Sequence, residues 1–288
     1  MSRQIGSEAY HYPSKVVRVC RGIRGVNLNS LWVLLKKGPS AAQSFLINSH
    51  RLYAGYGMPK PWDSLPWRKN LCVPKRSIGE IFPEIDFVRS PELVFPLSRD
   101  LGVNTEEMLI LAKVVNAMRP ERVIEFGTAE GRTAINLALQ IPAESEILTL
   151  DLPPIPGQND VGYFYWNHPA KAKIRQVFCS ITEWDSRPFT GTAGVVFGDA
   201  CDLMPGLGAE LFQAITVVKP GGVIFRHDYG SSIGATLFWN WVAKRLPVFH
   251  VAGTTLVCLR LSSSEVFERA QNLLSEPFLR ETVKFPKL

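Results

Sequence analysis

The chain has 288 residues, of which 46% are hydrophobic and 20% are charged, and this composition is typical of a globular protein and not of a disordered one. No apolar run approaches the length of about 18 residues that crosses a membrane, and the first residues lack the apolar core of a signal peptide, so neither feature is expected. The five cysteines are scattered without C-x-x-C spacing. They predict free thiols in a cytoplasmic protein and argue against a disulfide framework or a zinc site of that spacing.

Positive charge is concentrated toward the N-terminal end. Residues 1–79 hold 13 Lys and Arg against 2 Asp and Glu, whereas residues 80–288 hold 19 against 24. Such a basic arm meets nucleic acid, an anionic membrane or an acidic substrate, or it simply remains solvated. Residues 28–37 predict a short helix that either packs on the rest of the protein or lies at a membrane surface. We predict that residues 1–100 form an extension that serves as a lid or as a contact in a homo-oligomer.

Beyond residue 100 the chain alternates strands with helices. Asn104, followed by acids, begins a helix that Pro120 ends. Strands are predicted near residues 122–126, 146–150, 174–178, 194–198 and 222–227. Helices are predicted near residues 131–140, 206–218 and 232–245, and two last strands within 247–260 turn at Gly253. This alternation predicts an α/β fold over residues 101–288, with a doubly wound, mostly parallel sheet of seven strands.

The most informative stretch lies at the first two of these strands. Residues 123–131 read VIEFGTAEG, and residues 147–151 read ILTLD. With a helix between them they form a βαβ unit of the kind that binds an adenosine-type ligand. The spacing Glu125-x-Gly127-x-x-x-Gly131 has fewer glycines than a dinucleotide fingerprint, and its acid suits a cationic or amine-bearing ligand better than a pyrophosphate.

Ligands of an open α/β sheet bind beyond the carboxyl ends of the strands, so the residues that follow each predicted strand mark the site. Acids, a histidine and glycines fall on this rim: Gly127 to Gly131, Asp151, Cys179 to Ile181, Asp199, Asp202, and His227 to Tyr229. Their clustering favours an active site over a random polar edge.

At these residues the sequence resembles the class I S-adenosylmethionine (SAM) methyltransferases, whose first motif is E/D-x-G-x-x-x-G. The resemblance covers roughly residues 100–260 and includes VVFGD at 195–199, KPGG at 219–222 and HDY at 227–229. It reaches the metal-dependent sugar O-methyltransferases that act on macrolide antibiotics. It implies an enzyme that transfers the methyl group of SAM to a hydroxyl on a small molecule or sugar and releases S-adenosylhomocysteine.

The resemblance also implies roles for individual residues. The glycine loop would lie along the methionine moiety of SAM, and Asp151 would take the ribose hydroxyls. The implied SAM contacts are Glu125, Gly127, Thr128, Ala129, Gly131, Asp151, Ser180, Ile181 and Asp199. In the sugar methyltransferases, an acid after the fourth strand and an acidic pair after the fifth hold magnesium. Those positions are Asp199, His227 and Asp228 here.

Two mechanisms remain open at this end of the site. In the first, the carboxylates hold Mg²⁺ or another divalent cation, which positions a hydroxyl and lowers its pKa. His227 is less typical of Mg²⁺ and suits Mn²⁺, Fe²⁺ or Zn²⁺ better. In the second, His227 is itself the general base and there is no metal. The predicted catalytic residues are Asp199, Asp202, His227 and Asp228.

The sequence departs from the family pattern at three positions. Where the family has an acid before the serine that follows the third strand, this chain has Cys179 before Ser180. Where the family has an acid at the start of the fourth strand, this chain has Gly194. Where the sugar methyltransferases have the histidine proposed as base, this chain has Asp202. Asp202 replaces that base if burial or neighbouring acids raise its pKa, and it is otherwise a surface carboxylate.

Two other classes of function are weighed against this one. The basic arm motivates a nucleic-acid methyltransferase, but the chain lacks an Asn/Asp-Pro-Pro-Tyr motif, which methylation of base amino groups commonly uses. The three departures motivate a SAM-binding protein that has lost transfer activity.

Overall fold

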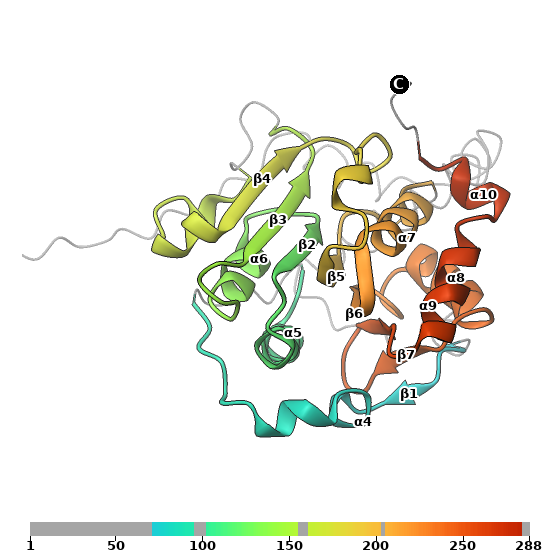
Figure 1. Cartoon of the computed structure of the whole chain (residues 1–288), viewed down its shortest axis with the longest axis horizontal. Coiled ribbons are helices and arrows are strands. Elements are labelled where there is room, and N and C mark those ends of the chain that lie inside the picture. Colours follow the sequence, from blue (N-terminus) through green and yellow to red (C-terminus); the bar gives the residue numbers. More distant parts are fainter. Residues whose placement is uncertain (1–70, 95–101, 155–160, 203–204, 284–288) are drawn as a thin grey trace, which may run out of the picture.

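The computed structural model describes residues 71–94, 102–154, 161–202 and 205–283. The helix predicted over residues 28–37 lies outside these residues, and so does most of the segment 1–100 that was predicted to be a lid or a contact in a homo-oligomer. The described part is a single mixed sheet with helices on both faces (Figure 1). None of its helices is both long and apolar enough to cross a bilayer.

The sheet has eight strands in the order β1-β7-β8-β6-β5-β2-β3-β4. Their bounds are β1 (Lys75–Arg76), β2 (Arg122–Phe126), β3 (Glu146–Asp151), β4 (Ile174–Phe178), β5 (Ala193–Gly198), β6 (Val218–Arg226), β7 (Val248–Val251) and β8 (Val257–Arg260). Strands β2 to β6 run parallel, whereas β8 is antiparallel to both of its neighbours, β6 and β7. The predicted parallel sheet and the hairpin at its C-terminal end are therefore confirmed.

The helices are α4 (Ile78–Ile81), α5 (Thr105–Met118), α6 (Arg132–Ala138), α7 (Gly206–Val217), α8 (Ile233–Ala243), α9 (Ser264–Leu273) and α10 (Pro277–Arg280). Short 3-10 turns are η3 (Pro83–Phe87), η4 (Tyr163–Tyr165), η5 (Pro169–Lys173) and η6 (Arg187–Phe189). Helices α5 and α6 cover one face of the sheet, and α7 to α10 cover the other. Along each central strand, alternate residues join the two cores, as the pleat requires: Val123 packs under α5 and Ile124 packs under α7.

The prediction of seven strands was wrong by one, because β1 joins the sheet edge. Its two residues, Lys75 and Arg76, are both exposed. The strand is held by backbone contacts, since His250 donates to the Pro74 carbonyl and Ala252 donates to the Arg76 carbonyl, each at 2.8 Å. Two charged residues show no apolar alternation, so the sequence carries no strand signal here.

Residues 71–94 belong to the predicted extension, yet several of their side chains are part of the folded core. Phe82 and Ile85 are buried with residues of α5 and β6. The boundary at residue 100 remains a prediction. The capping box formed by Ser77 and Glu80 begins α4 and is a helix signal that the sequence analysis did not use.

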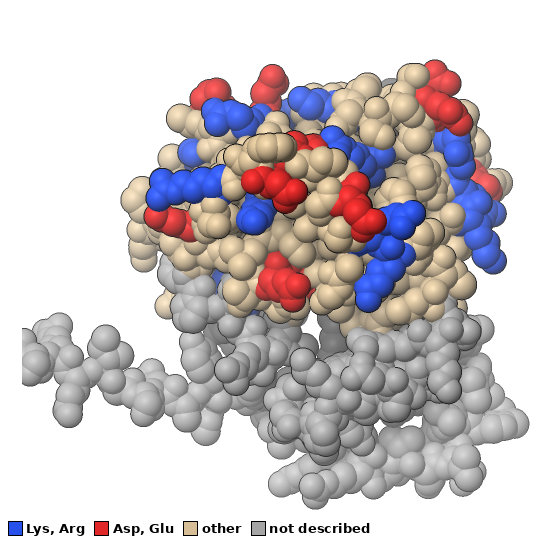
Figure 2. Space-filling model, turned by 90° about the horizontal axis from the view of Figure 1, so that it is seen from below, with Lys and Arg blue, Asp and Glu red and all other residues tan. Residues whose placement is uncertain are grey.

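Charges on the described surface are mixed. Seen from below, Lys and Arg lie among Asp and Glu over the described surface (Figure 2). The excess positive charge belongs to residues 1–79, because residues 80–288 carry more acids than bases.

Candidate active site

The carboxyl ends of the central parallel strands meet at one edge of the sheet. Backbone hydrogen bonds continue past the strand ends, since Gly127 donates to the Leu150 carbonyl at 2.8 Å and Asp199 donates to the Phe126 carbonyl at 2.7 Å. Strand β2 lies between β3 and β5, so the strand order reverses on either side of it. This edge is the topological switch point at which open α/β sheets bind ligands.

The loop after β2 is packed closely against two other segments. Gly127 has φ +94°, and a Cβ there would lie 2.6 Å from the Asp199 carbonyl oxygen. Gly131 has φ +84°, and a Cβ there would meet the Tyr165 ring at 2.5 Å. Both positions therefore need glycine, for the dihedral angle and for the space. Ala129 between them also has a positive φ, of 45°.

Asp151 ends β3 beside this loop. Its Oδ2 accepts a hydrogen bond from the Ala129 amide and its Oδ1 accepts one from the Leu152 amide, both at 2.7 Å. Leu152 is 60% exposed, and Phe178, which pairs with Asp151 at the end of β4, is 48% exposed. A partly exposed carboxylate thus lies beside two exposed apolar side chains, a mixture that suits the polar ribose and apolar base of a nucleoside.

A chain of buried polar side chains supports the loop from below. Thr149 donates to Glu125, Thr149 and Thr128 share a hydrogen bond of 2.6 Å, and Gln176 donates to Thr128 at 3.1 Å. Tyr165 in turn donates to Gln176. Burial raises the pKa of Glu125 to about 8 against the opposing effect of the Thr149 hydrogen bond. The structure therefore places Glu125 beneath the loop and not on the rim surface, although the sequence predicted it as a direct SAM contact.

Two neighbouring residues at the end of β6 point to opposite faces of the sheet. Arg226 faces α7, where its Nε lies 3.1 Å from Oε1 of Glu210. His227 faces α5, where its Nε2 lies 3.1 Å from Oε2 of Glu107. Because successive side chains of a strand alternate in direction, each of these rim residues has a carboxylate partner in a different helical layer.

Arg226 ties the segment after β5 to β6. Its guanidinium lies 3.2 Å from Asp202 Oδ1 and 3.5 Å from Asp199 Oδ1, and it donates to the Cys201 carbonyl at 2.6 Å. Burial alone would lower the pKa of Arg226, but the surrounding carboxylates raise it. Burial raises the pKa of Glu210 to about 7. Asp202, a predicted base, is thus buried and bound to a guanidinium, and it is no surface carboxylate.

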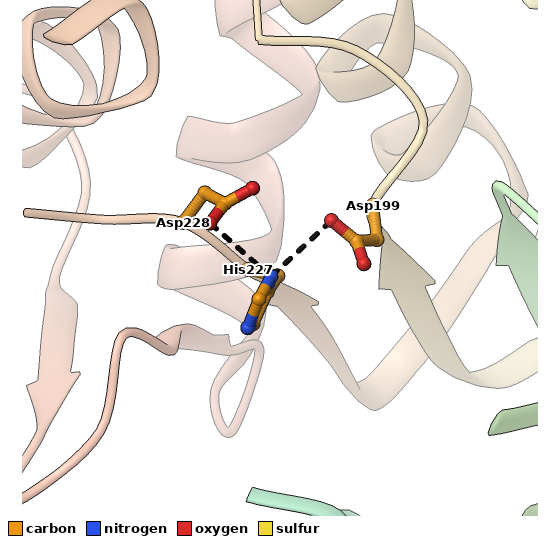
Figure 3. A group of neighbouring side chains, drawn as sticks. All are labelled: Asp199, His227 and Asp228. Carbon is orange, nitrogen blue, oxygen red and sulfur yellow. Dashed lines mark ion pairs between the residues drawn. The ribbon is translucent and has the colours of Figure 1, made fainter. Parts of the chain in front are cut away.

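His227, Asp199 and Asp228 face one another (Figure 3). His227 Nδ1 lies 3.3 Å from Asp199 Oδ1 and 3.5 Å from Asp228 Oδ1, and one ligand atom from each residue lies within 4.8 Å of the others. Burial would lower the pKa of His227, but the two carboxylates raise it well above its usual value. Burial would raise the pKa of Asp228, but His227 lowers it.

A divalent cation fits these three residues. His227 is 5% exposed, and its Nδ1 has no hydrogen-bond partner of suitable geometry among the described residues, although two carboxylate oxygens lie nearby. A nitrogen lone pair and two carboxylates are a common ligand set for divalent transition metals. Asp228 is also held in place, because Ser231 donates to its Oδ1 at 2.6 Å.

The predicted contacts after β4 lie at the same edge. Cys179 donates its amide to the Asp151 carbonyl at 2.9 Å, and the Ser180 and Thr182 hydroxyls are 2.8 Å apart. Ser180 and Ile181 are partly exposed. Burial raises the pKa of the Cys179 thiol, so it does not supply the charge of the acid that it replaces.

Three residues of this site were not predicted from the sequence: Glu107, Glu210 and Arg226. Glu107 carried only a helix-start signal, and Glu210 and Arg226 carried none. They become part of the site through contacts between segments far apart in sequence, such as the pair Glu107–His227, which are 120 residues apart. No local spacing predicts such a contact.

No protein-family model matches the sequence, and no curated protein matches it either. Solved structures do match. The O-methyltransferase TomG from Streptomyces achromogenes, solved in complex with SAM, is 17% identical, with a TM-score of 0.45 over 77% of this chain and 99% of that one. A methyltransferase from Geobacter sulfurreducens is 16% identical, with a TM-score of 0.46 over 56% and 80%. CalS11, a TDP-rhamnose 3′-O-methyltransferase of calicheamicin biosynthesis, is 17% identical, with a TM-score of 0.44 over 56% and 82%.

The sheet itself decides the fold. Its parallel strands wind outward in both directions from β2, helices cover both faces, and an antiparallel hairpin completes one side. The chain has a doubly wound α/β fold with a mostly parallel sheet. In this fold, the loop predicted to bind SAM, Asp151 and the Asp199–His227–Asp228 group all lie along one edge of the sheet.

Proposed function

We propose that this protein is a SAM-dependent methyltransferase that methylates a hydroxyl on a small molecule or sugar. One observation carries the proposal: the Asp151 carboxylate accepts a hydrogen bond from Ala129, in the middle of the glycine loop, at 2.7 Å. The two motifs that would hold the ribose and the methionine of SAM therefore lie side by side at the switch point.

The rim suits the charge and the shape of SAM. Asp151, Asp199 and Asp228 are partly exposed carboxylates at this edge, and SAM carries a sulfonium cation. Ribose hydroxyls would donate to Asp151, and the exposed side chains of Leu152 and Phe178 would flank the adenine. Glu125 would act indirectly, by holding Thr149.

Methyl transfer is an in-line displacement. The acceptor oxygen bonds to the methyl carbon while the S–CH₃ bond breaks, and its electron pair returns to sulfur to give the neutral thioether S-adenosylhomocysteine. The hydroxyl proton must pass to a base near this oxygen. The side chains of Asp199 and Asp228 are 19% and 21% exposed, against 4% for Asp202. We therefore assign the proton to Asp199, because His227 lowers the pKa of Asp228 and makes that carboxylate a poor proton acceptor.

Asp199, His227 and Asp228 would hold a divalent cation at this position. Such an ion lowers the pKa of an alcohol and fixes its direction. The support for this part of the proposal is the buried His227 Nδ1, which faces both carboxylates and has no hydrogen-bond partner in the part of the chain that the structure describes.

The test is formation of S-adenosylhomocysteine from SAM with a panel of hydroxyl acceptors, including nucleotide-activated sugars, glycosides and phenols. We expect product with at least one acceptor, loss of activity with a chelator, and recovery when a divalent ion is restored.

Asp199→Asn, which removes a ligand and a candidate base, should lower the rate by about 10²-fold or more. If SAM binds but no acceptor yields product, the protein is a SAM-binding protein without transfer activity. Turnover that is indifferent to the chelator would remove the metal from the proposal.

A further inference from the structure

Glu107 is a buried carboxylate on α5, a helix that covers one face of the sheet, and it contacts the site through His227. It is 1% exposed. Its Oε1 accepts hydrogen bonds from the amide and the hydroxyl of Thr255, at 2.7 and 2.8 Å. Its Oε2 accepts from the Asn104 amide at 3.0 Å and lies 3.1 Å from His227 Nε2. Contacts on both oxygens fix the carboxylate in place.

This contact determines which nitrogen of His227 carries the proton. Both oxygens of Glu107 accept hydrogen bonds from N–H or O–H donors, and this pattern is that of an ionised carboxylate. An ionised carboxylate accepts only, and therefore Nε2 must donate to it. In the neutral imidazole the lone pair then lies on Nδ1. That nitrogen faces Asp199 Oδ1 at 3.3 Å and Asp228 Oδ1 at 3.5 Å.

A lone pair that faces two carboxylate oxygens in a buried space is repelled unless a positive charge lies between them. A second proton or a metal ion provides that charge. Nδ1 has no hydrogen-bond partner of suitable geometry among the described residues, as expected of a nitrogen whose lone pair is directed at a metal ion. Glu107, His227 and the ion would then form a carboxylate–histidine–metal arrangement, in which the outer carboxylate orients the ring and raises the basicity of the ligand nitrogen.

We propose that Glu107 is a positioning residue that presents His227 Nδ1 as a metal ligand, and that the resulting set of one nitrogen and two carboxylates selects a transition-metal ion of the Mn²⁺, Fe²⁺, Co²⁺ or Zn²⁺ class over Mg²⁺. The proposal rests on the proposed metal-assisted function and adds the class of ion and the residue that sets it. Imidazole favours these ions, whereas Mg²⁺ prefers an all-oxygen set with several waters.

The test measures metal binding by the full-length protein after removal of metals with a chelator. Binding of Co²⁺ is followed by its visible absorption, and binding of Mg²⁺ by calorimetry. We expect the wild-type protein to bind Co²⁺ at least about 10-fold more tightly than Mg²⁺. Glu107→Gln should weaken Co²⁺ binding by about 10- to 100-fold, shift the Co²⁺ absorption bands and change Mg²⁺ affinity much less.

Thr255→Val is the matched control. It removes one hydrogen bond from the same Glu107 carboxylate but leaves the Glu107–His227 contact. It should lower the unfolding midpoint while the ratio of Co²⁺ to Mg²⁺ affinity stays as in the wild type. An equal loss of both affinities in Glu107→Gln, or a wild-type preference for Mg²⁺, would overturn the proposal.

A measurement on the wild-type protein covers the case in which Glu107→Gln does not fold. Two-bond ¹H–¹⁵N correlations of the Zn²⁺-loaded, ¹⁵N-labelled protein report the state of each histidine nitrogen. We expect a protonated Nε2 and a metal-bound Nδ1 at His227, and the opposite assignment refutes the proposal. Calorimetry with SAM distinguishes failure of this proposal from failure of the proposed function. If SAM binds but no divalent ion does, only the role of Glu107 is refuted. If SAM does not bind, the proposed function is refuted.

Discussion

Burial changes what single acidic side chains of this site can do. Glu125 is fully buried, its Oε1 lacks a hydrogen-bond partner among the described residues, and its pKa is raised to about 8. A carboxyl group with this pKa is mostly protonated at neutral pH. The acid of the first motif therefore acts here as a neutral hydrogen-bonding group beneath the loop, which its position in the sequence could not reveal.

The raised pKa of Glu125 predicts how stability depends on pH. The folded state holds this proton up to about pH 8, whereas the unfolded chain releases it near the ordinary glutamate pKa of 4.5. The stabilising contribution is complete below the unfolded pKa and is lost as pH rises toward the folded one. We expect the free energy of unfolding of the wild type to fall between pH 5 and 8, by up to about 1.4 kcal/mol per pH unit from this group.

Glu125→Gln mimics the protonated group and should flatten this slope in denaturant titrations at several pH values. Glu144→Gln, at an exposed position, is the control and should leave the slope unchanged. Parallel slopes for the wild type and Glu125→Gln would show that Glu125 is ionised in the folded protein.

The glycine loop is the element on which the site depends. It passes so close to the chain after β5 that a Cβ at Gly127 would lie 2.6 Å from the Asp199 carbonyl. The loop and the segment that carries Asp199 therefore fix each other, and a change in one displaces the other.

Gly127→Ala should destabilise the protein by about 1–3 kcal/mol from its positive φ alone and should also weaken SAM binding, because the added methyl group pushes the loop from Asp199. Gly221→Ala separates the two effects. Gly221 also has a positive φ, of 78°, but a Cβ there would meet nothing within 4 Å. Unfolding curves and SAM titrations of both variants check the prediction, which fails if Gly127→Ala binds SAM as tightly as Gly221→Ala does.

The pattern of apolar runs in the sequence predicted the parallel strands well. Contacts between side chains that are far apart in sequence could hardly be predicted. Apolar runs that end in Gly127, Asp151 or Asp199 are local signals, and they placed the rim correctly. The strand β1 and the ion pair between Glu107 and His227 depend on contacts across 120 residues or more. Such contacts follow from how α5 and β7 pack in the fold, and the local periodicity of apolar residues does not predict that packing.

At the scale of the whole molecule, one tyrosine links the N-terminal segment to the site. Tyr229 follows the candidate ligand Asp228, and its buried hydroxyl accepts from the Val73 amide at 3.1 Å and donates to Asn240 at 2.7 Å. Asn240 also accepts from the Cys72 amide at 3.0 Å. The start of the described fold is therefore bound by hydrogen bonds to the residue that follows Asp228 in sequence.

Tyr229→Phe should cost about 1–3 kcal/mol of unfolding free energy, because it leaves the Val73 amide without its acceptor. It should also speed hydrogen exchange at the His250 and Ala252 amides, which bond to the β1 segment. Tyr163→Phe is the control, since Tyr163 is 60% exposed. Unchanged exchange at both amides in Tyr229→Phe would mean that β1 is held in place without this hydroxyl.

Binding of SAM is the most direct test of the account. Calorimetry of the folded wild-type protein should show uptake of SAM and of S-adenosylhomocysteine. Asp151→Ala should weaken the binding of both compounds by about 1–3 kcal/mol, or roughly 5- to 150-fold. The control is Asp185→Ala, which removes a carboxylate bound to Arg187 and should bind both compounds as tightly as the wild type does. Absence of binding heat for both compounds, or equal affinity of the wild type and Asp151→Ala, would contradict the account.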